Sequence, residues 1–162
     1  MKKNIFVFSF SVFLCIFSTT ASSLVPLNQW ASSKQFTTLS IPDTVYLSLR
    51  CSIAFNINKE IIEEYSNLKA DGLRDKVNAH RSVYATGSTI MMKDKSKTVK
   101  DDYMKSLPME VKNISDAYFY ALKKNMPVPH SMMNELLAGD IGFCNAIDRQ
   151  IMDLHKLMQK NN

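Results

Sequence analysis

The sequence predicts an all-α protein: a small helical bundle of about four helices behind a cleaved N-terminal signal peptide, held by one disulfide. Three observations predict this fold class. Apolar residues recur every three or four positions in several long segments, which is the period of a helix. Only four glycines occur in 162 residues, which disfavours a turn-rich all-β fold. Two cysteines, Cys51 and Cys144, remain once the leader is removed.

The first 21 residues have the three-part layout of a secretory signal peptide. The basic start "MKKN" precedes an apolar run over residues 5–17, and the small residues of "STTASS" follow. Such a run is shorter than the ~20 residues that cross a bilayer. We therefore expect cleavage after Ala21 or Ser23, export to a bacterial periplasm or beyond, and no stable membrane insertion afterwards. A retained single-pass anchor and a lipoprotein modified at Cys15 are the alternatives.

The remaining chain, about 140 residues, has the size of one domain. We expect an extended N-terminal segment over residues 22–40 and a single helical domain over residues 41–162. The formal net charge of +5 includes Lys2 and Lys3, which leave with the leader. The net positive charge that remains after cleavage is ordinary for the surface of a soluble protein. No nucleic-acid partner is therefore predicted.

The segment "TVYLSLRCSIAFNIN" (residues 44–58) raises a choice between strand and helix, because every odd position from 45 to 57 is apolar. No comparable alternating run is available elsewhere to pair with it as a strand. Ser40, Pro42 and Asp43 suit the start of a helix. Helical spacing then continues through residues 59–68. We therefore expect a helix that is buried on most sides.

A second helix is expected over residues 71–86, where apolar and aromatic positions step by four and three. Gly87 is placed to end this helix. The lysines of residues 93–102 are interleaved with acidic residues and predict a solvated linker, with a weak helical turn over residues 99–106.

Two more helices complete the predicted bundle. Pro108 interrupts the weak turn, and Ser106 is a candidate cap for a helix over residues 108–125. The segment "MPVP" (residues 126–129) breaks that helix. The last helix, over residues 130–159, has the clearest apolar stripe.

Cys51 and Cys144 each fall on the expected core face of a helix, the first and the last of the bundle. An oxidising compartment favours their pairing. The loop that this disulfide closes spans about 93 residues. Closing a loop of this length reduces the conformational entropy of the unfolded chain and would stabilise the fold by on the order of 4–5 kcal/mol. Two buried free thiols and an intermolecular bridge are the alternatives.

Catalytic motifs are missing from the sequence. No serine lies in a G-x-S-x-G element, and four scattered glycines cannot build a phosphate-binding loop, so no cofactor is expected. His80 falls on the apolar stripe of its helix and is interpreted as a core or boundary histidine. We therefore expect a protein that is not an enzyme, with a small hydrolase of unrecognised site as an alternative.

Histidine–methionine pairs offer a metal-binding alternative. Thioether and imidazole groups together suit Cu(I), a relevant metal in a bacterial envelope. Methionine is also a common core filler, and two of these methionines fall on the apolar stripe of the last helix. A periplasmic Cu(I)-binding protein would use His130, Met132, Met133, His155 and Met158.

The main functional expectation is a non-catalytic protein-binding module, such as an inhibitor, immunity factor, adaptor or accessory subunit. Its partner would be an unknown envelope or extracellular protein. Aromatic residues beyond the needs of one narrow core face are candidates for the contact surface. The alternative is that they complete a second layer of the bundle. These residues are Tyr46, Phe119, Tyr120 and Phe143.

Overall fold

The structure is a computed structural model that describes residues 24–33, 40–66, 69–124 and 135–160. No strand occurs within these ranges, so the predicted all-α class is confirmed. The predicted leader over residues 1–21 lies outside them. The described helices are α1 (Leu27–Ser32), α2 (Ile41–Ser66), α3 (Asp71–Met92), α4 (Lys97–Lys124) and α5 (Glu135–Lys160).

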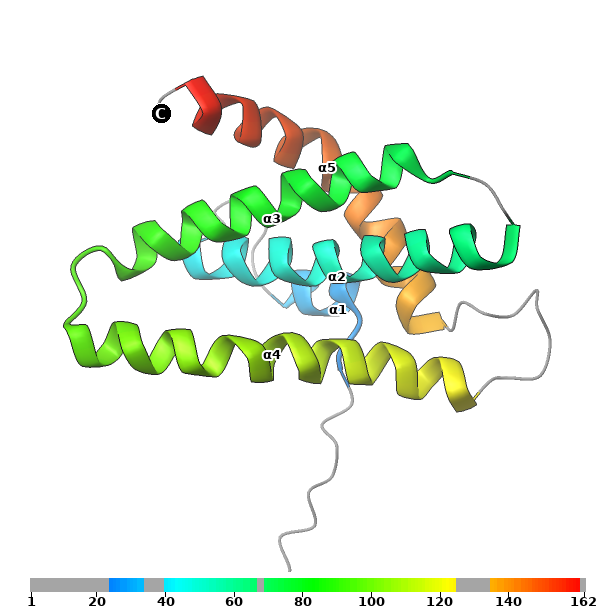
Figure 1. Cartoon of the computed structure of the whole chain (residues 1–162), viewed down its shortest axis with the longest axis horizontal. Coiled ribbons are helices and arrows are strands. Elements are labelled where there is room, and N and C mark those ends of the chain that lie inside the picture. Colours follow the sequence, from blue (N-terminus) through cyan, green and yellow to red (C-terminus); the bar gives the residue numbers. More distant parts are fainter. Residues whose placement is uncertain (1–23, 34–39, 67–68, 125–134, 161–162) are drawn as a thin grey trace, which may run out of the picture.

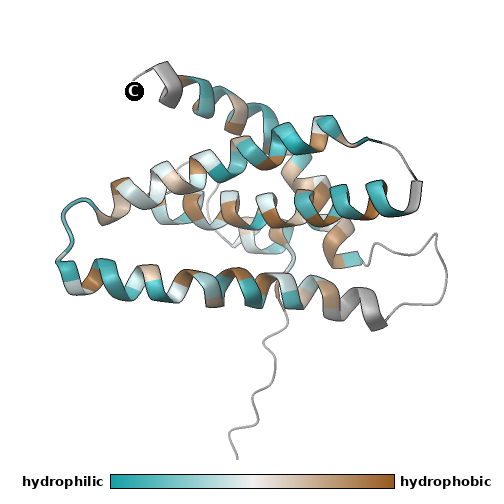
Figure 2. Cartoon of the chain, viewed as in Figure 1, coloured by the Kyte–Doolittle hydropathy of each residue, from teal (hydrophilic) through white to brown (hydrophobic). Residues whose placement is uncertain are grey.

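The helices pack around α2, as Figure 1 shows. Helix α3 runs antiparallel beside α2, α5 crosses behind this pair, and α1 packs against α5. Helix α4 lies along the other side of α2, at the lower edge of the view. Hydrophobic residues gather where α2 meets its neighbours (Figure 2). Among the described residues, no helix combines the length and the apolar character that a membrane span requires.

The start of α2 follows the predicted capping pattern. The Ser40 hydroxyl accepts a hydrogen bond from the Asp43 backbone N–H at 3.3 Å and donates to the Asp43 carboxylate at 2.5 Å. Further along, Leu47, Phe55 and Ile57 are all buried. Because α3, α4 and α5 pack on different sides of α2, its apolar residues can point in several directions and still be covered.

The predicted disulfide joins α2 to α5. Cys51 and Cys144 are bonded, with their Cα atoms 5.6 Å apart, and both side chains are fully buried. The bond links residues 93 positions apart in sequence and fixes the central helix to the last one.

Gly87 does not end its helix, contrary to the sequence-based expectation, because α3 continues to Met92. A Cβ atom at Gly87 would lie 2.7 Å from Cγ2 of Val45. The glycine therefore serves the close approach of α2 and α3. Spacing along one helix cannot distinguish this tertiary role from a helix stop.

The predicted break before residue 108 is also wrong, since α4 is one helix from Lys97 to Lys124. The predicted linker shrinks to residues 93–96. Ser106 caps no helix; its hydroxyl donates to the Tyr103 carbonyl at 2.8 Å. Pro108 is exposed, so the carbonyl that loses its helical partner there can bond to water.

The N-terminal segment over residues 22–40 was expected to be extended, but it contains α1, which makes five described helices rather than four. Six residues are too few to show a helical period or to be stable alone. Leu27 and Ala31 are buried in the bundle and hold α1 in place. The last helix begins at Glu135, and residues 130–134 lie outside the described ranges.

Replacing Gly87 by Ala is expected to lower the free energy of unfolding by about 1–3 kcal/mol, because the new methyl group would overlap Val45. Gly139→Ala is the control, since nothing lies within 4 Å of a Cβ atom at that position. The control is expected to gain about 0.5–1 kcal/mol from helix propensity. Urea denaturation of both variants measures the difference. Equal effects would contradict a close contact of α2 and α3 at Gly87.

Candidate functional site

A buried polar cluster at the centre of the bundle joins α2, α4 and α5. Arg50, Tyr118 and Asp140 are each fully buried. Arg50 donates to Oδ2 of Asp140 from Nε at 2.9 Å and from Nη2 at 2.6 Å. The Tyr118 hydroxyl donates to the same oxygen at 2.5 Å. Burial, and after it the charge of Asp140, raises the pKa of Tyr118, which keeps that hydroxyl protonated as a donor.

The second carboxylate oxygen of Asp140 holds the start of α1 against the bundle. Its Oδ1 accepts a hydrogen bond from the Leu27 backbone N–H at 2.7 Å, at the first residue of that helix. A carboxylate at a helix N-terminus satisfies a free amide group and meets the positive end of the helix dipole. Arg50 also donates to the Tyr46 hydroxyl at 3.1 Å. One carboxylate therefore connects α1, α2, α4 and α5.

This buried cluster was not predicted from the sequence, although the sequence holds a signal for part of it. On the last helix, Asp140 lies three residues after Leu137 and four before Cys144, so it shares their buried face. Three fully buried charged or phenolic groups that satisfy one another serve packing and specificity. The cluster is closed to solvent and fixes the relative positions of the helices that it joins.

His80 is a core histidine, as expected from its place on α3. It is fully buried and packs against the Phe55 ring, with centroids 5.4 Å apart. Its Nε2 lies 3.8 Å from Oδ1 of Asp148, and neither ring nitrogen has a hydrogen-bond partner among the described residues. Burial lowers the pKa of His80 to about 4, against the opposing charge of Asp148. The imidazole is therefore neutral at pH 7.

Of the five proposed copper ligands, only His155 has a described side chain. His130, Met132 and Met133 lie outside the described residues, as does the side chain of Met158. His155 is half-buried on α5. No group of three histidine, cysteine, aspartate or glutamate residues that could hold a metal ion occurs within the described ranges. The copper alternative stays an untested prediction.

The four aromatic candidates for partner contact have different surroundings. Tyr46 and Phe143 are partly buried and pack against the core. Phe119 on α4 is 44% exposed. The side chain of Tyr120 lies outside the described part. Packing within the chain thus accounts for two of the four, and Phe119 remains a candidate for contact.

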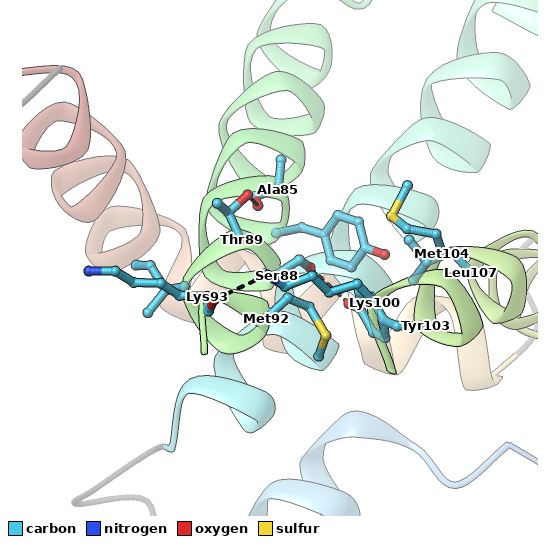
Figure 3. A pocket seen from close by; sticks show the side chains of 11 residues that line it. Ala85, Ser88, Thr89, Met92, Lys93, Lys100, Tyr103, Met104 and Leu107 are labelled. Carbon is cyan, nitrogen blue, oxygen red and sulfur yellow. Dashed lines mark hydrogen bonds between the residues drawn. The ribbon is translucent and has the colours of Figure 1, made fainter. Parts of the chain in front are cut away.

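A groove of about 630 Å³ lies between the end of α3 and the start of α4 (Figure 3). The short turn over residues 93–96 brings the two helices together at one end. Farther along, α4 leaves α3 and packs on the bundle through the buried Ile114 and Tyr118. The walls of the groove are mostly apolar. Their main residues are Tyr84, Ile90, Met92, Tyr103, Met104 and Leu107.

Few polar groups enter the groove. The hydroxyls of Ser88 and Tyr103 share a hydrogen bond of 2.9 Å across it. Nζ of Lys100 donates to the Lys93 carbonyl at 3.2 Å, while the Lys93 ammonium group points away in Figure 3. The Tyr84 hydroxyl lies near Ser88 and Tyr103 but completes no hydrogen bond with a described residue. Burial raises the pKa of Tyr84, so this hydroxyl stays protonated, and its oxygen is buried from solvent behind the wall of the groove.

The apolar surface continues beyond the groove. Ile90 on one wall is 50% exposed, and Met104 on the other is 64% exposed. Val99, near the start of α4, is 45% exposed. Exposed apolar side chains therefore stand on both rims of the groove. The groove was not predicted, because the charges of residues 93–102 indicate a solvated linker and not the wall of a groove.

A histidine lines neither this groove nor a second cavity between α1, α2 and α4. The described surroundings of both cavities thus lack the histidine–carboxylate pair that the hydrolase alternative needs. No protein-family model, curated protein or solved structure matches this chain.

Asp140→Ala is expected to lower the free energy of unfolding by about 3–5 kcal/mol, because Arg50 would stay buried without its counter-charge. The double variant Arg50→Met with Asp140→Leu should recover most of that loss, since no buried charge remains. Asp153→Ala, which removes an exposed ion pair with Lys156, should have little effect. Urea denaturation of the oxidised proteins provides the measurement. Equal losses for Asp140→Ala and Asp153→Ala would contradict the central role of this cluster.

The buried His80 makes stability depend on pH. Its pKa is about 4 in the folded protein and 6.5 in the unfolded chain, so the unfolded chain binds more protons between these values. The free energy of unfolding therefore has its full value above pH 6.5. Protonation of His80 in the unfolded chain lowers it as the pH falls, by about 2 kcal/mol between pH 7 and pH 5. His80→Gln should remove this part of the dependence and His155→Gln should retain it. Denaturation curves at both pH values measure it, and an unchanged dependence in His80→Gln would refute the assignment.

Proposed function

We propose that this chain is an exported, non-catalytic protein-binding module whose α3–α4 groove holds an amphipathic helix of a partner protein. The observation that carries this proposal is the apolar groove of about 630 Å³ with exposed aliphatic and thioether side chains on both rims. Helix-in-groove binding uses apolar anchors spaced by three or four residues, which fit a channel between two helices.

The composition of the groove favours a helical protein segment over a small enclosed ligand. Small ligands are mostly surrounded by their sites, whereas Ile90 and Met104 stand half or more exposed. Met92 and Met104 contribute flexible, polarisable side chains, which adapt to the irregular surface of a partner helix. The area outside the groove, including Val99, would be covered by the same helix.

Charge specifies the partner further. Lys100 and Lys93 line one end of the groove, and no acidic residue is among its described lining residues. An aspartate or glutamate on the partner helix would meet Lys100 there. The expected partner segment therefore combines an apolar face with an acidic residue at one end.

The export part of the proposal rests on the leader pattern and on the disulfide. A bond between Cys51 and Cys144 is stable in an oxidising compartment and is rarely kept in a reducing one. The non-catalytic part rests on the groove itself, because its described lining residues include lysines and tyrosines but no histidine and no carboxylate.

Site-specific photo-crosslinking in cells that express the full chain tests the proposal. Met104→p-benzoylphenylalanine places the reactive group in the groove. Met109→p-benzoylphenylalanine is the matched control, because Met109 lies on the same helix, outside the groove, and is 62% exposed compared with 64% for Met104. We expect a discrete protein adduct from position 104 and none from position 109. Leu107→Asp in the first variant should abolish the adduct.

Mass spectrometry of the adduct decides the outcome. A crosslinked peptide with helical apolar spacing and an acidic residue supports the proposal. Lipid adducts alone, identical adducts from both positions, or no adduct from position 104 would contradict it. The same spectra test export, because a mature N-terminus at Ser22 or Leu24 supports it and an N-terminus at Met1 contradicts it.

A further inference from the structure

A second cavity, of about 550 Å³, lies between α1, α2 and α4 and shares no lining residue with the groove. Its walls carry two aromatic rings and one carboxylate. The described lining of the groove, by comparison, has lysines and no carboxylate. Its principal lining residues are Leu24, Trp30, Tyr46, Met109, Glu110 and Ile114.

The aromatic rings belong to Trp30 and Tyr46. Their centroids are 5.1 Å apart and the ring planes are tilted by 44°. The face of an aromatic ring attracts an organic cation, tryptophan most strongly, and tilted aromatic residues are the usual walls of sites for quaternary ammonium groups. Methyl groups on such a cation would also pack well against Leu24, Met109 and Ile114.

Glu110 provides the counter-charge. It is the one charged side chain among the described residues that line this cavity. Glu110 is partly buried, and no described cation forms an ion pair with it. Burial raises the pKa of its carboxyl group, because the charged form loses hydration without gaining a partner. A cationic ligand would supply that partner.

One cation does lie nearby, on the core side of Tyr46. Nη1 of Arg50 donates to the Tyr46 hydroxyl at 3.1 Å. Its charge is compensated, however, because Arg50 is ion-paired with Asp140 at 2.6 Å. The net charge that a ligand meets in the cavity is therefore that of Glu110.

We propose that this cavity binds an organic ammonium ion, with its alkylated nitrogen against Trp30 and Tyr46 and with Glu110 as the counter-ion. A single carboxylate with aromatic and apolar walls suits a large, weakly hydrated cation. It does not suit a metal ion such as Ca²⁺, which needs six or more oxygen ligands. This site is separate from the groove of the proposed function and does not depend on it.

Trp30 allows a direct test, because it is the only tryptophan in the chain. Its fluorescence is recorded while the oxidised protein is titrated with tetramethylammonium, with choline, and with 3,3-dimethylbutan-1-ol, the neutral isostere of choline, at constant ionic strength. We expect a saturable change with both cations and at least tenfold weaker binding of the neutral alcohol. Equal binding of the alcohol, or no saturable change with either cation, would overturn the proposal.

Variants of the carboxylate test its role. Glu110→Gln should weaken tetramethylammonium binding at least tenfold, while Glu110→Asp, which keeps the charge, should retain binding within a few-fold. Glu64→Gln removes an exposed carboxylate on α2 and should leave binding unchanged. Circular dichroism confirms that each variant is folded. Wild-type affinity in Glu110→Gln, or equal losses in Glu110→Gln and Glu64→Gln, would refute the assignment.

Discussion

The arrangement of this bundle depends on the buried carboxylate of Asp140. A charge without water requires partners for all of its lone pairs, and here they come from Arg50, Tyr118 and the Leu27 amide. These donors belong to α1, α2 and α4, and they lie 113, 90 and 22 positions from Asp140 in sequence. The demand for satisfied hydrogen bonds therefore selects one relative placement of four helices, which apolar contacts alone leave less specific. The nearby disulfide holds two of these helices, α2 and α5, at a fixed distance.

The placement of α4 connects this core to the binding surfaces. Tyr118 and Ile114 hold one part of α4 in the bundle, and the turn over residues 93–96 holds its start close to α3. Between these two attachments, the side chains of α3 and α4 do not fill the space between the two helices. This unfilled space is the groove. The second cavity lies where the same helix meets α1 and α2. A change in the central cluster would therefore alter both surfaces together.

The two cavities differ in charge because α4 contributes different residues to each. Lys100 lies in the groove, whereas Glu110 lies in the second cavity, ten positions later. An acidic apolar segment in the groove and a cation in the other cavity, as proposed above, would thus meet opposite charges on the same helix. Two distinct ligands could be held by the same chain without competing for the same side chains.

The sequence by itself determined the helical class, the start of α2 just after Ser40 and the pairing of Cys51 with Cys144. These follow from periodicity, from capping chemistry and from the presence of only two cysteines after the leader. Tertiary structure decided the rest. Gly87 reads as a stop along one helix, yet its role depends on Val45 of another. The groove and the second cavity are spaces between helices, and their shape depends on how α4 is attached to α2. No local pattern encodes that distance, because it results from side chains that meet only after the chain has folded.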